Sequence, residues 1–214
     1  MIEIDPREVA RYLGYHGAQP DPTVNAMITR CMEEVNEAAE PRCISRRFPM
    51  EFTAGGQIRI GSLELTTTSL QRNLAGCDEV FLFAATLGVT VDMLIRRTAM
   101  LDSAKGLVMQ AAAAAATEAY CDAENDKLRQ KTESEGLYLR PRFSPGYGDL
   151  SLDCQRTFLR MLNAAKEIGL TLTDSGLMVP IKSVTAIIGI SSIPTVCHRQ
   201  GCEACTKTDC SFRR

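Results

Sequence analysis

Six consecutive alanines at positions 111–116 constrain the fold of this 214-residue chain more than any other feature. Alanine has the highest helix propensity, and the sequence from Val89 to Gln130 has a helical character throughout. We therefore predict a long helical stretch here, with a break near Asp102 or Gly106. Because alanine is small, the run fits a tightly packed core helix or a helix that a ligand approaches closely.

The sequence before this stretch predicts helices followed by hairpins. An Asp-Pro pair starts each of the first two helices, because Asp caps a helix N-terminus and Pro is tolerated at its first position. Glycine-containing turns separate three strand-like pieces, which is typical of hairpins. A short helix with a Ser69 cap and a buried strand come next. The predicted elements are helices at 5–15, 21–40 and 69–77 and strands at 43–52, 57–60, 63–67 and 79–88.

The sequence after this stretch predicts an extended segment at 137–143, a loop at 144–151 and strands at 176–180 and 183–190. One helix is predicted over residues 152–169. Its apolar stripe consists of Phe158, Leu159, Leu162 and Ala165. This order of elements predicts an α+β fold, with helices packed on a mainly antiparallel twisted sheet.

The composition changes at Pro194 from apolar to polar and cysteine-rich. We therefore expect a single domain over residues 1–194 and a Cys-rich tail over residues 195–214. The tail holds Cys197, Cys202, Cys205 and Cys210 in the spacing C-x4-C-x2-C-x4-C. Thiolates at such spacing are ligands of an iron–sulfur cluster or of zinc, while disulfides and free thiols stay open as alternatives.

Charge and composition exclude some classes of partner. The formal net charge is −2 and tryptophan is absent, which argues against a nucleic-acid partner. The longest apolar run is far shorter than the roughly 20 residues that cross a bilayer, and the N-terminus lacks a signal pattern, so we expect a cytoplasmic protein without a membrane partner. The thiols are then expected to be reduced and each scattered cysteine buried. These are Cys31, Cys43, Cys77, Cys121 and Cys154.

Two segments carry side chains that suit ligand binding. In the segment 139–149, Arg142 precedes Gly146 and Tyr147, so a guanidinium, a flexible turn and a ring lie close in sequence. Glu118 and Asp122 lie one helical turn apart on the face that continues the alanine run. The alternatives are a surface turn with an ion-paired arginine and an ordinary exposed helix end.

Three motifs in the C-terminal half together resemble the activation domain of cobalamin-dependent methionine synthase. "RFSPGY" at 142–147 is similar to the R-x-x-P-G-Y loop of that family, and "TEAYCDA" at 117–123 to its acidic helix. "LTDSGLMVPIKSVTA" at 172–186 is similar to its L-T-[ED]-S-x-x-M-x-P-x-x-S-V element. The resemblance is good over residues 108–192 and loose over residues 1–100. After Tyr147, Gly-Asp-Leu-Ser replaces a Pro-Ala-Cys-Pro type run.

The resemblance implies a role in methionine biosynthesis. It implies a stand-alone accessory protein that binds S-adenosylmethionine and supports the reductive remethylation of cob(II)alamin. The cobalamin is expected on a partner, a separate methionine synthase, because this chain has no D-x-H-x-x-G motif. The electron is expected from a flavodoxin or ferredoxin-type donor. The chain is thus expected to be an activation component and not a complete methyltransferase.

The resemblance also implies roles for individual residues. Arg142 is expected to hold the carboxylate of S-adenosylmethionine, and Gly146 and Tyr147 to line the ligand. The acidic residues expected to face its positive groups are Glu118, Asp122 and Glu135.

Two other functions are compatible with the sequence. The chain could activate a different corrinoid methyltransferase, with the same ligand and another partner. It could also be a zinc- or iron–sulfur-binding structural or interaction module without S-adenosylmethionine chemistry, since the cysteine spacing has no counterpart in the resembling domain.

Overall fold

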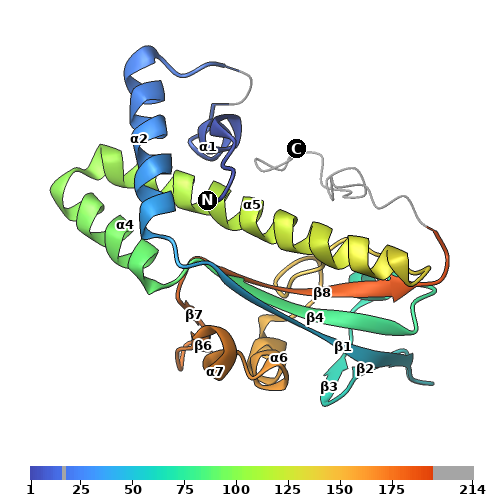
Figure 1. Cartoon of the computed structure of the whole chain (residues 1–214). Helices are drawn as coiled ribbons and strands as arrows, with labels where there is room; N and C mark the ends of the chain where they lie inside the picture. The colour runs from blue at the N-terminus through green and yellow to red at the C-terminus, as the bar shows by residue number, and fades with distance from the viewer. Residues whose placement is uncertain (16–17, 195–214) are drawn as a thin grey trace. The chain divides into compact units, whose positions relative to one another are not determined.

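The computed structural model of the chain describes residues 1–15 and 18–194 (Figure 1). Contacts divide the chain into two compact units. Unit 1 consists of Met1–Cys43, Ala85–Asn125 and Ala164–Val184. Unit 2 consists of Ile44–Ala84, Asp126–Asn163 and Thr185–Arg214, described here as far as residue 194.

Unit 1 contains the predicted N-terminal helices, α1 (Pro6–Tyr12) and α2 (Pro22–Ala38). The Asp5 and Asp21 side chains cap them as predicted. Each accepts a hydrogen bond of 2.8 Å from the backbone N–H two residues later. Such caps satisfy N–H groups that the helix itself leaves without an acceptor.

The alanine run lies in α5 (Ser103–Ser134), whose residues up to Asn125 belong to unit 1. Five of the six alanines are at most 5% exposed. They share a core cluster with Ile28 of α2 and with Val91 of α4 (Val89–Leu101). Small side chains on nearly every side of the helix allow this close packing.

The long helical stretch breaks at Asp102, one of the two predicted positions. The backbone of Asp102 is extended, with φ −150° and ψ 105°, and its N–H donates to Thr98 O of α4. Its Oδ1 accepts from Lys105 N at 2.9 Å and so caps α5. Gly106 is needed for the close approach of the two helices, because a Cβ there would lie 2.6 Å from the Cα of Ala99.

The rest of unit 1 is a short helix, α7 (Ala164–Ile168), and a two-stranded hairpin. The hairpin pairs β6 (Thr171–Leu172) with β7 (Met178–Val179) in antiparallel register. The strand predicted at 176–180 contains β7, whereas no strand was predicted at the position of β6.

Most of a six-stranded sheet lies in unit 2, and only two residues each of β1, β4 and β8 belong to unit 1. The hairpins β1–β2 and β2–β3 are antiparallel, as is the pair β5–β8. The strands are, in order across the sheet, β3 (Leu63–Leu65), β2 (Ile58–Ile60), β1 (Arg42–Phe52), β4 (Glu79–Thr86), β8 (Ser183–Ser191) and β5 (Tyr138–Leu139). The predicted α+β fold with a mainly antiparallel sheet is thereby confirmed.

The prediction of one continuous helix over residues 152–169 is wrong. The structure has a 3-10 turn, η1 (Leu152–Cys154), then α6 (Gln155–Leu162), and a break at Asn163 with φ 55°. Asn is among the few residues that adopt this left-handed conformation readily. The break changes the phase of the helix, so that Ala164 is buried and the predicted stripe residue Ala165 is exposed.

Within unit 2, α6 lies against one face of the sheet (Figure 1). Phe158 and Leu162 are fully buried there. Two hydrogen bonds attach the helix to strands: Gln155 Nε2 donates to Thr185 Oγ1 at 3.4 Å and Arg46 Nη1 donates to Met161 O at 3.5 Å.

The predicted burial of the scattered cysteines is correct for three of the five. Cys31, Cys77 and Cys121 are buried, whereas Cys43 and Cys154 are half-buried. Both half-buried thiols donate to oxygen atoms, Cys43 to Glu124 Oε2 at 3.4 Å and Cys154 to Ser151 O at 3.1 Å. Burial was expected because cysteine often packs as a small apolar residue. The polar contacts of Cys43 and Cys154 explain why these two are only half-buried.

The four tail cysteines lie outside the described residues. The domain boundary at residue 194 and the metal site at the tail cysteines therefore stay predictions. Across residues 1–15 and 18–194, no helix is long and apolar enough to cross a membrane.

Candidate functional site

The segment that contains Arg142 is attached to β8 of unit 2 through its backbone. Arg140 N donates to Gly189 O at 2.8 Å, and Phe143 and Ile187 exchange two hydrogen bonds of 2.9 and 2.8 Å. Arg142 lies between these two attachments. Its side chain is half-buried, with Nη1 fully inside the protein.

Beyond Phe143 the chain turns sharply at Gly146. Its φ of 92° favours glycine, and its N–H donates to Leu150 O at 2.8 Å. Leu150 N in turn donates to Tyr147 O at 3.0 Å. The turn presents the Tyr147 ring outward, where 67% of the residue is exposed. Arg142, Gly146 and Tyr147 thus share one loop whose backbone is held by hydrogen bonds.

Asp149 closes the loop against α3 (Thr68–Asn73), also in unit 2. Its carboxylate accepts hydrogen bonds from Thr67 Oγ1, from Thr68 N at 2.7 Å and from Ser69 N at 3.0 Å. These donors, the Thr67 hydroxyl first among them, hold the pKa of Asp149 well below its usual range. Asp149 is therefore ionised at neutral pH.

The start of α3 lies earlier than the predicted cap at Ser69. The capping side chain is Thr67, whose Oγ1 accepts from Leu70 N at 3.2 Å, and not Ser69. The N–H of Ser69 is engaged by Asp149, which is 80 residues away in sequence. No local pattern signals this contact.

The two acidic candidates of α5 lie in unit 1. Residues 111, 115, 118 and 122 follow one face of the helix, and burial falls along it. Ala111 and Ala115 are buried, Glu118 is half-buried and Asp122 is exposed. The face that begins in the core thus reaches the solvent with its carboxylates.

Glu135 lies in unit 2, just after the end of α5. Its Oε2 accepts a hydrogen bond of 2.9 Å from Arg47 Nη1, and Arg47 also pairs with Glu79. A ligand cation at Glu135 would compete with Arg47 for this carboxylate. Glu135 is therefore the candidate least suited to holding a positive group.

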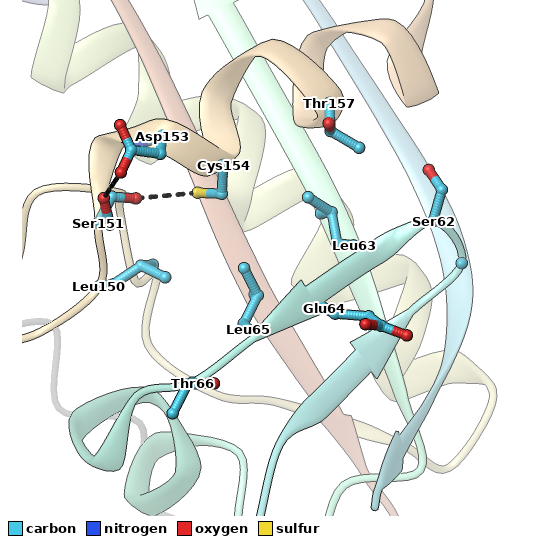
Figure 2. Close-up of a pocket in the computed structure, with 11 residues that line it drawn as sticks. Ser62, Leu63, Glu64, Leu65, Thr66, Leu150, Ser151, Asp153, Cys154 and Thr157 are labelled. Atoms are coloured by element: carbon cyan, nitrogen blue, oxygen red, sulfur yellow. Dashed lines mark hydrogen bonds between the residues drawn. The ribbon is translucent and has the colours of Figure 1, made fainter.

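A pocket of about 470 Å³ opens in unit 2 between β3 and the segment that starts α6 (Figure 2). Leu63 and Leu65 of β3 lie on one side of it, and Leu150, Asp153 and Cys154 lie on the segment that leads into α6. Burial raises the pKa of the Cys154 thiol to about 11, so that this cysteine is a poor nucleophile at neutral pH. Nothing in the sequence signalled this pocket.

Within the described part of the chain, no group of three or more His, Cys, Asp or Glu side chains is arranged to hold a metal ion. The candidate residues of each unit are charged or hydrogen-bonding side chains. In unit 2 the guanidinium of Arg142 suits a carboxylate, and in unit 1 the carboxylates of Glu118 and Asp122 suit cations.

The fold is similar to that of a solved protein. The MetH reactivation domain bound to AdoHcy matches with a TM-score of 0.60 at 18% identity, over 91% of this chain and 78% of that chain. A search of curated proteins found no match.

The family is shown by sequence. The family model described as the activation domain of vitamin B12 dependent methionine synthase matches residues 70–193, more than half of the chain. The chain therefore belongs to this family. The match confirms the resemblance drawn from the three motifs, and it begins at residue 70, well before the expected start at 108.

Proposed function

We propose that this chain binds S-adenosylmethionine and presents its methyl group for the reductive remethylation of a cobalamin held by a methionine synthase. Membership in the activation-domain family carries this proposal. The bound AdoHcy named for the structural neighbour supports it, because AdoHcy is what remains of S-adenosylmethionine after methyl transfer.

The reaction needs a methyl group and an electron, and the cofactors supply the chemistry. The chain's own residues bind and orient. In the proposal, Arg142 pairs with the carboxylate of the ligand, while the backbone at Gly146 and the exposed ring of Tyr147 line it. The family resemblance assigns the ammonium and sulfonium groups to Glu118 and Asp122, with Glu135 as a further acidic candidate. A flavodoxin or ferredoxin-type protein donates the electron, and the site of action is the cytoplasm.

Isothermal titration of the purified chain with S-adenosylmethionine tests the proposal. We expect saturable binding with one site per chain. A folded chain that gives no binding signal up to millimolar ligand would refute the proposed function.

The partner is identified by a second measurement. The chain is immobilised with S-adenosylmethionine present and mixed with cell extract, and the captured proteins are analysed for bound cobalamin. Capture of a cobalamin-dependent methionine synthase is expected. Capture of a different corrinoid methyltransferase instead would reassign the partner while leaving the ligand in place.

We further propose that Cys197, Cys202, Cys205 and Cys210 bind a metal, since four thiolates suit an iron–sulfur cluster or zinc. Metal analysis and a visible spectrum of anaerobically purified chain distinguish the two. Iron with absorbance that bleaches on reduction indicates a cluster, and one equivalent of colourless zinc indicates a structural site. Replacing the four cysteines by serine is expected to abolish the bound metal, and a chain without either metal contradicts this proposal.

A further inference from the structure

The loop that carries Arg142 and Tyr147 has one anchor at each end. The first is the backbone pairing of Phe143 with Ile187, next to Arg142. The second is the Asp149 carboxylate, which lies two residues beyond Tyr147. Tyr147, which lies between these two anchors, is largely exposed.

The second anchor uses both carboxylate oxygens. Oδ1 accepts from Thr67 Oγ1 and Ser69 N, and Oδ2 accepts from Thr68 N. Hydrogen bonds to an ionised acceptor are about twice as strong as those between neutral groups. The depressed pKa of Asp149 agrees with this geometry.

The backbone at Gly148 also lies close to the start of α3. A Cβ on Gly148 would lie 2.6 Å from Ser69 Oγ and 2.8 Å from Ser69 Cβ, and its φ of 54° favours glycine. Gly148 and Asp149 are therefore fitted to the start of α3 as a pair.

We infer that Asp149 is a positioning residue for the ligand loop: it holds Gly146 and Tyr147 in their binding geometry by fastening the loop to α3. This inference rests on the proposed function, because the effect is exerted on bound S-adenosylmethionine. Asp149 itself need not touch the ligand, since its oxygens are engaged by three donors at the start of α3.

A double-mutant cycle separates positioning from mere stabilisation. The dissociation constant for S-adenosylmethionine is measured by titration for the wild type, Asp149→Asn, Tyr147→Ala and the double variant. We expect Asp149→Asn to raise the dissociation constant about tenfold in the wild-type background and less than about threefold in the Tyr147→Ala background. The loss of effect is expected because Asp149 acts through Tyr147.

Asp153→Asn is the matched control, an exposed aspartate four residues further on whose carboxylate accepts from Ser151 Oγ at 2.8 Å. It should bind like the wild type. If Asp149→Asn does not fold by circular dichroism, Thr67→Val takes its place, because it removes the hydroxyl that donates to Asp149 and caps α3 while it keeps the carboxylate charge. About a threefold rise is expected for that variant.

An Asp149→Asn chain that melts at a lower temperature yet binds with the wild-type constant would overturn the inference, as would effects that add fully in the double variant. An unchanged dissociation constant for Thr67→Val would likewise overturn the inference. A wild type that does not bind S-adenosylmethionine refutes the proposed function and this inference together, so the two failures are told apart by the wild-type titration.

Discussion

Arg142→Ala is expected to raise the dissociation constant for S-adenosylmethionine about 100-fold, equivalent to about 2.7 kcal/mol of binding free energy. The guanidinium is half-buried between two backbone attachments to β8, so little conformational freedom is lost when it grips a carboxylate. Removing one member of such a charged, hydrogen-bonded pair typically costs 2–5 kcal/mol of binding. Isothermal titration measures the change.

The control for this variant is Arg72→Ala, which removes an arginine from the last turn of α3. It is expected to bind as the wild type does. Arg142→Lys should recover only part of the affinity, because an ammonium group cannot form two parallel hydrogen bonds with a carboxylate. Equal affinity of wild type and Arg142→Ala, with both chains folded, would show that the carboxylate is held elsewhere.

Phe158→Ala is expected to lower the free energy of unfolding by about 4 kcal/mol. The Phe158 side chain is fully buried beneath the sheet of unit 2, so its loss removes apolar contacts and leaves a cavity. Urea unfolding followed by circular dichroism measures the change.

The matched control is Phe52→Ala at the end of β1, where the residue is 46% exposed. The same chemical change there should cost less than about 1 kcal/mol. Similar losses for the two variants would contradict the placement of α6 on the sheet.

The sequence predicted those parts of the fold that depend on neighbouring residues. Asp-Pro pairs located the starts of α1 and α2, and the glycine-containing turns located the hairpins around β2. The long helical stretch breaks at Asp102, one of the two positions that the sequence prediction named.

Features that depend on distant contacts were not predicted. The break at Asn163 lies inside a sequence with uninterrupted helical spacing. Asp149 reads locally as a loop residue, and its partners Thr67, Thr68 and Ser69 come about 80 residues earlier.

The candidate site shows the same division. The residues Arg142, Gly146 and Tyr147 were found because they form a continuous motif, and the structure places them on one hydrogen-bonded loop. The ion pair of Glu135 with Arg47 was not foreseen, since Arg47 belongs to a strand 88 residues earlier. A single sequence does not show that Glu135 and Arg47 form an ion pair.

The buried alanines of α5 limit how this chain can diverge. Consecutive helical residues point about 100° apart, so Ala111, Ala112 and Ala113 together face most directions around the axis, and all three are at most 5% exposed. A larger side chain at any of them would force neighbouring helices apart. The alanine run, which looks like a compositional bias, is thus among the parts of the protein that least tolerate a larger side chain. Substitutions there should be confined to glycine, serine and alanine.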